Sequence, residues 1–133
     1  MGRPPLHESV AKRFLQAGVS DVHYSVTPEG HVLVQMPFVL HARHLNQVAR
    51  SHGFELREGR TPEIRYELQT YRVGPVAGTD VAGGVPSLEV MHPDHAEPVA
   101  VVSKTPSHLL LVRHERGIDF ALKLAQLVKE KQK

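Results

Sequence analysis

Residues 118–133, IDFALKLAQLVKEKQK, form the segment of this chain that most clearly predicts its fold. Strong helix formers fill the segment, and neither proline nor glycine follows Gly117. Lysines lie in the last turn, where cations complement the helix dipole. Apolar residues cover more of this helix than the single stripe, about 100° wide, of an ordinary surface helix. The segment therefore predicts a long C-terminal helix with two apolar sides.

These two sides are neighbouring stripes. One comprises Ile118, Ala121, Leu122, Ala125 and Val128, and the other comprises Phe120, Leu124 and Leu127. If the first stripe packs on a sheet, the second needs another cover, which is either more of this chain or a second molecule. The second stripe is therefore a candidate interface for a homodimer or a protein partner, and full burial in the core is the alternative.

The bulk composition indicates an ordinary globular protein. The chain has 133 residues, of which 41% are hydrophobic. It has no cysteine, which excludes disulfides and zinc–thiolate sites. No apolar run reaches the roughly 18 residues of a membrane helix, and the first residues, MGRPPLHES, lack the apolar core of a signal peptide. We expect one domain, residues 1–133, in the cytoplasm and without a membrane partner.

Shorter segments upstream alternate with turn residues and predict a sheet. Helices are expected over residues 7–17 and 40–52, each ended by a glycine. Strands are expected over residues 21–27, 31–36, 54–58, 62–73, 85–91, 98–103 and 109–112, with a turn at Gly59-Arg60 and a mobile glycine-rich loop over 74–84. Apolar and charged residues alternate within 62–73, which indicates one wet face and antiparallel pairing. The predicted class is α+β: a single antiparallel sheet of about five to seven strands, with helices on one face.

A short internal similarity suggests a repeated unit. Residues 25–34, SVTPEGHVLV, resemble residues 103–111, SKTPSHLLL, when one residue is deleted. Each copy follows a predicted strand and precedes a predicted helix. The chain could therefore contain two strand–turn–strand–helix units, at about 20–52 and 98–131. Thr-Pro turns also recur for purely local reasons, which is the alternative explanation.

Basic residues are distributed unevenly along the chain. The net charge is only +2, but residues 73–98 contain no Lys or Arg, so the cations fall on either side of an acidic middle. Such a layout can create a local positive surface, and the planar guanidinium group suits phosphate. The candidate nucleic-acid-binding residues are Arg43, Arg50, Arg57, Arg60, Arg113, Arg116 and Lys129.

Two observations limit this prediction. Glutamates such as Glu55, Glu58, Glu63 and Glu67 are interleaved with the arginines and could pair with them instead. Aromatic residues make up only 5% of the chain and there is no tryptophan, so a platform for stacking single-stranded bases is poorly supplied. If nucleic acid binds, contacts to the backbone of a duplex are expected.

Ten histidines raise the question of a metal site. His41 and His44 are three residues apart on a predicted helix, and His92, Asp94 and His95 cluster in a predicted loop. These side chains are ordinary ligands for zinc, manganese, nickel or iron. Nothing in the sequence brings the two groups together, and neither has HExxH spacing. Histidines at the boundary of an apolar helix face are the alternative.

No catalytic or cofactor motif is present. The sequence His23-Tyr24-Ser25-Val26 has no second copy to complete a phosphoesterase pair, no GxSxG elbow occurs, and the glycine-rich loop matches no phosphate-binding pattern. We therefore expect a binding protein rather than an enzyme, without a cofactor. The leading hypothesis is a nucleic-acid-associated accessory protein. The alternatives are a protein-interaction or assembly subunit that uses the C-terminal helix and the glycine-rich loop, and a histidine-ligated metal-dependent hydrolase.

Overall fold

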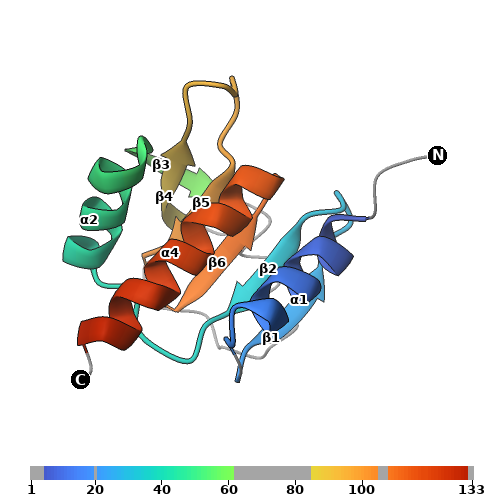
Figure 1. Ribbon diagram of the computed structural model, residues 1–133. Helices are drawn as coiled ribbons and strands as arrows, with labels where there is room; N and C mark the ends of the chain where they lie inside the picture. The colour runs from blue at the N-terminus through green and yellow to red at the C-terminus, as the bar shows by residue number, and fades with distance from the viewer. Residues whose placement is uncertain (1–4, 20, 62–84, 105–107, 132–133) are drawn as a thin grey trace.

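The computed structural model describes residues 5–19, 21–61, 85–104 and 108–131. These residues form three helices and six strands, shown in Figure 1. In chain order the elements are α1 (Leu6–Gln16), β1 (His23–Val26), β2 (Val32–Gln35), α2 (Ala42–His52), β3 (Glu55–Thr61), β4 (Val85–Met91), β5 (Ala100–Ser103), β6 (Leu109–Val112) and α4 (Glu115–Lys131).

The strands form one sheet in the order β1-β2-β6-β5-β4-β3, and every neighbouring pair is antiparallel. The three helices lie together on one face of this sheet, with α4 between α1 and α2 (Figure 1). The predicted α+β class is therefore confirmed. The predicted units also have the same element order, β1–β2–α2 and β5–β6–α4. A common origin of the two stays a prediction.

The β1–β2 hairpin illustrates how local chemistry forms these elements. The backbone N–H of Thr27 donates to the carbonyl of His31 at 2.9 Å. The N–H of His31 in turn donates to the Thr27 hydroxyl at 3.1 Å. Between them Gly30 has a φ of 84°, a conformation that glycine adopts at little cost. The Thr-Pro-Glu-Gly sequence thus closes the hairpin and fixes its register.

The central strands β2, β5 and β6 are buried on both faces of the sheet. Val34, Leu110 and Val102 lie in one cross-strand row on the helix-covered face. Leu33, Leu111 and Val101 form the next row, on the opposite face, and are at most 1% exposed. This explains why these strands read as continuous apolar runs rather than as alternating ones.

The second apolar stripe of the long helix α4 packs largely against residues of the same chain. Phe120 and Leu124 are fully buried, and the Phe120 ring lies 5.2 Å from that of Phe54, which directly follows α2. These two side chains are therefore core residues and are not accessible to a partner. Of the three candidate interface residues, only Leu127 is partly exposed, beside α2.

Several element boundaries differ from those predicted. The expected turn at Gly59-Arg60 is wrong, because β3 continues to Thr61 and pairs with β4 along its whole length. The helix α4 begins at Glu115, three residues earlier than expected. The strand over 85–91 and the strand over 109–112 are confirmed. The predicted strand 62–73 and loop 74–84 lie outside the described residues.

Candidate nucleic-acid interface

The arginines of the strands and loops are engaged within the molecule. Arg57 on β3 donates through Nε to Glu89 on β4 at 3.0 Å. Arg116, in the first turn of α4, donates to Asp94 at 3.0 Å, and Arg113 lies 3.8 Å from Glu97. Arg60 also interacts within the chain. Neutralisation by these carboxylates weakens the case for Arg57 and Arg116 as contacts to a nucleic-acid backbone.

The described cations that form no ion pair are all on helices. They are Lys12 on α1, Arg43 and Arg50 on α2, and Lys123 and Lys129 on α4. Two helical arginines do have a described acidic partner. Arg116 pairs with Asp94, and Arg13 on α1 pairs with Asp119 on α4. Free positive charge in the described residues is thus concentrated on the outer side of the helical layer.

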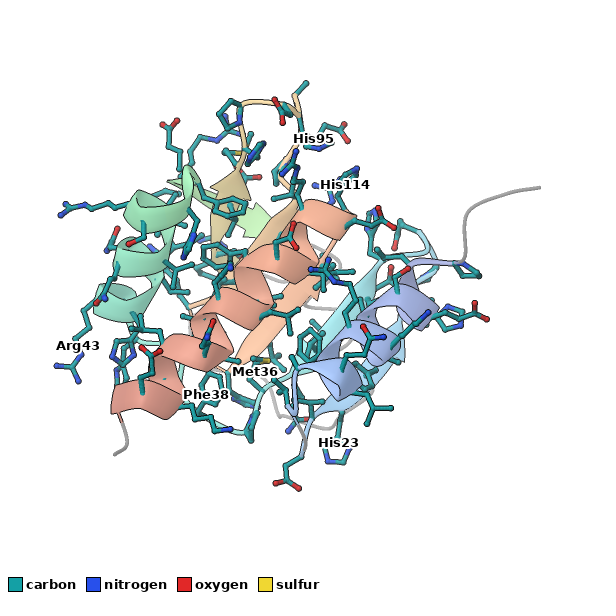
Figure 2. All side chains as sticks on the ribbon, viewed as in Figure 1. His23, Met36, Phe38, Arg43, His95 and His114 are labelled. Atoms are coloured by element: carbon teal, nitrogen blue, oxygen red, sulfur yellow. The ribbon has the colours of Figure 1, made fainter. Side chains whose placement is uncertain are left out.

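Arg43 and Arg50 stand on the side of α2 that faces away from the core. Both are exposed, as is Gln47 between them, whereas Leu45 and Val48 point inward and are buried. Figure 2 shows Arg43 extending from the molecule into solvent. Seven residues separate the two arginines, so they are about 10.5 Å apart along the helix axis. Unlike Arg57, they have no carboxylate partner among the described residues.

A groove between α2 and α4 adjoins these arginines. It has a volume of about 260 Å³. Gln47 and Ser51 contribute from α2, and Lys123 and Gln126 from α4. Glu130 is the acidic residue in its wall. Lys123 lines this groove, and Arg43 and Arg50 lie on the exposed outer side of α2, next to Gln47 in its wall; we call these three cations the basic helix face.

Lys129 lies on the other flank of α4. It lines a larger cavity, of about 800 Å³, between α1 and α4, together with Phe38 and Arg13. Figure 2 places Phe38 near the C-terminal end of α4. The seven predicted cations are therefore spread over several surfaces: only Arg43 and Arg50 belong to the basic helix face. Lys123 was missed by the sequence reasoning, because nothing local distinguishes it from other surface lysines.

The predicted metal ligands come from two separate places. His41 caps the N-terminal end of α2 and its ring centroid lies 5.6 Å from that of His44, which is buried. His92 instead contacts Phe54, which follows the C-terminal end of this helix. A helix of 11 residues is about 16 Å long, so α2 separates the groups. Among the described residues, no three His, Asp or Glu side chains are arranged to hold a metal ion.

The segment His23-Tyr24-Ser25 on β1 forms no recognisable catalytic site with other described residues. His23 points from this edge strand into solvent (Figure 2). Tyr24 alternates with it, toward the helices, and its ring makes an edge-on contact with that of Phe14 at 6.0 Å. Burial raises the pKa of the Tyr24 hydroxyl above its usual value.

Comparison with protein-family models, with curated proteins and with solved structures finds no match to this chain. No described helix is both long enough and apolar enough to span a lipid bilayer. A functional proposal must therefore be based on the residues themselves.

Proposed function

We propose that this protein binds the phosphate backbone of double-stranded nucleic acid through the basic helix face. The observation that carries the proposal is the segregation of charge: Arg57, Arg113 and Arg116 have acidic partners, whereas Arg43 and Arg50 have none among the described residues. Cations without an intramolecular partner can replace the counterions of a polyanion, and this release drives backbone binding.

The chemistry of the groove fits contacts to phosphate rather than to bases. Gln47, Ser51 and Gln126 supply neutral donors between the cations, and such side chains commonly hydrogen-bond to phosphate oxygens. Among the described residues, no phenylalanine, tyrosine or tryptophan lines this groove, and His52 is its only aromatic ring, so stacking of unpaired bases is poorly provided for. We therefore expect binding that depends strongly on salt and weakly on sequence.

Fluorescence anisotropy with a short duplex, titrated across salt concentrations, tests this proposal. The double variant Arg43→Gln with Arg50→Gln should lower the affinity about tenfold or more at low salt. It should also reduce the slope of log K against log salt by about 2, since each phosphate contact contributes roughly 0.9.

The matched control is Arg57→Gln with Arg60→Gln, which removes the same charge from the edge strand β3. This variant should retain nearly all of the affinity, because Arg57 is already paired with Glu89. Equal losses in the two double variants would show that only total charge matters, and the basic helix face would then not be the site. Absence of binding to duplex by the wild-type protein at low salt would refute the proposal altogether.

A further inference from the structure

A second polar pocket lies where three segments meet at the N-terminal end of α4. The turn before β2 contributes His31, the loop between β4 and β5 contributes His95 and Glu97, and the β6–α4 junction contributes Arg113 and His114. The cavity has a volume of about 230 Å³. Figure 2 shows His95 and His114 next to each other at this end of the helix, well away from Arg43.

Two hydrogen-bond donors in this pocket have no described partner. The Nε atom of Arg113 is buried and makes no hydrogen bond. The nearest carboxylate is that of Glu97, which is 83% exposed and lies 3.8 Å from Nη2 of Arg113, too far for a hydrogen bond. His95 packs its ring 3.9 Å from that of His114, and neither of its ring nitrogens bonds to a described residue. Buried donors are normally satisfied, so the unpaired Nε of Arg113, in the same pocket as the half-buried His95, indicates a ligand that accepts hydrogen bonds.

The orientation of the neighbouring imidazoles favours an anion over a cation. The backbone N–H of Arg116 donates to Nδ1 of His114 at 3.1 Å, and that of Asp94 donates to Nδ1 of His92 at 3.1 Å. In the neutral form of each ring the proton is therefore on Nε2, so the outer edge of each ring is a donor. The start of α4 adds the positive end of the helix dipole. Among the described residues, moreover, no group of side chains is suited to a metal ion.

Without the histidines, the three segments carry two arginines and four carboxylates, a net charge of −2. Arg113 and Arg116 are the cations, and Arg116 is already paired with Asp94 at 3.0 Å. The acidic groups of these segments are Glu29, Asp94, Glu97 and Glu115.

We propose that this pocket binds a phosphate dianion, either as inorganic phosphate or as the phosphoryl group of a monoester. Arg113 binds it through its Nε and Nη2 donors, displacing Glu97, and His95 donates a third hydrogen bond. The planar guanidinium can present two parallel donors to two phosphate oxygens. The site is distinct from the basic helix face, so each proposal can fail without the other.

Calorimetric titration with sulfate tests the pocket, because the charge of sulfate stays constant over the relevant pH range. At constant ionic strength and near-neutral pH, the wild-type protein should bind sulfate with a stoichiometry of one anion per chain. Inorganic phosphate and phenyl phosphate near neutral pH then identify the source. Equal affinities would indicate the free anion, and tighter binding of phenyl phosphate would indicate a monoester; both outcomes support the shared phosphate chemistry.

Variants locate the site. Arg113→Gln should reduce sulfate affinity about tenfold or more, through loss of the charged bidentate donor. His95→Asn should also lower the affinity, because it removes the imidazole donor. The matched control is Arg43→Gln with Arg50→Gln, which should bind sulfate as the wild-type protein does.

Circular dichroism checks that each variant is folded. If Arg113→Gln does not fold, His95→Asn decides alone: unchanged sulfate affinity would overturn the proposal. Failure of the wild-type protein to bind sulfate, phosphate or phenyl phosphate would also overturn it. So would equally strong competition by chloride, because the binding would then reflect general attraction of anions.

Discussion

Gly117 shows how one residue can determine where a helix meets the sheet. A Cβ atom at this position would lie 2.2 Å from the carbonyl oxygen of Val99 and 3.2 Å from the Cβ of Ala100. The same carbonyl accepts hydrogen bonds from the N–H groups of Arg113 and His114, at 2.9 and 3.2 Å. Because residue 117 is a glycine, the first turn of α4 can lie close to the backbone of Val99. The same Val99 carbonyl holds Arg113 and His114, which line the pocket at the N-terminal end of α4.

We predict that Gly117→Ala lowers the free energy of unfolding by about 3 kcal/mol, because the backbone must move to remove the clash. Chemical denaturation measures the change. Gly18→Ala is the comparison: nothing lies within 4 Å of its Cβ position, and only its φ of 75° is unfavourable. That variant should lose about 1 kcal/mol. A Gly117→Ala protein as stable as the Gly18→Ala protein would show that the backbone near Val99 yields easily.

Tyr24 provides a pH dependence of stability. Burial raises the pKa of its hydroxyl in the folded protein, so the folded state holds the proton more tightly than the unfolded state. The resulting stabilisation is complete below the unfolded pKa of about 10 and is lost as the pH rises through the folded pKa. Urea unfolding near pH 8 and near pH 10.5 should show a smaller loss of stability in Tyr24→Phe than in the wild type. The effect is small because the side chain is partly exposed. Identical losses would exclude Tyr24 as the source.

At the scale of the elements, α4 is the helix around which the others are arranged. The sequence predicted that α4 has two apolar stripes, but it did not predict which part of the protein packs against the second stripe. Helix α2 supplies that cover, and Phe54 meets the ring of Phe120 beside it. The reason is topological: α2 and α4 are far apart in sequence, yet both follow strands that pack them on the same face of the sheet.

This arrangement predicts different costs along the second apolar stripe. Phe120→Ala should lower the free energy of unfolding by about 3–5 kcal/mol, since it leaves a cavity between α4, α2 and the sheet. Leu127→Ala, at a partly exposed position, should cost about 1 kcal/mol. Denaturation measured at several protein concentrations gives both values. A loss for Phe120→Ala that disappears at low protein concentration would point to an interface between molecules rather than to the core.

At the scale of the whole molecule, the charges divide into paired and unpaired groups. Long-range pairs such as Arg57–Glu89 and Arg116–Asp94 bring together residues 32 and 22 positions apart. They neutralise cations that look equivalent to Arg43 and Arg50 in the sequence. The proposed duplex-binding face and the proposed phosphate pocket then lie at different parts of the helical layer, with Arg43 and His95 well separated in Figure 2.

The sequence by itself determined the elements whose signals are local. Glycines ended α1 and α2, the Thr-Pro-Glu-Gly turn closed the first hairpin, and helix formers produced α4. Hydrophobic periodicity also indicated the α+β class, because it reports which side of each element is apolar. Where a local signal misled, as at Gly59-Arg60, pairing with β4 overrode it.

Only the tertiary structure decided which residues share a surface. Whether Phe120 is core or interface, and which arginines keep a free charge, depends on what the fold places opposite each side chain. His31, His95 and Arg113 likewise converge on one cavity from three separate segments. Periodicity extends over a few residues, whereas these contacts span tens of residues and depend on strand order. That is the physical reason why one sequence predicts the elements of this protein better than its sites.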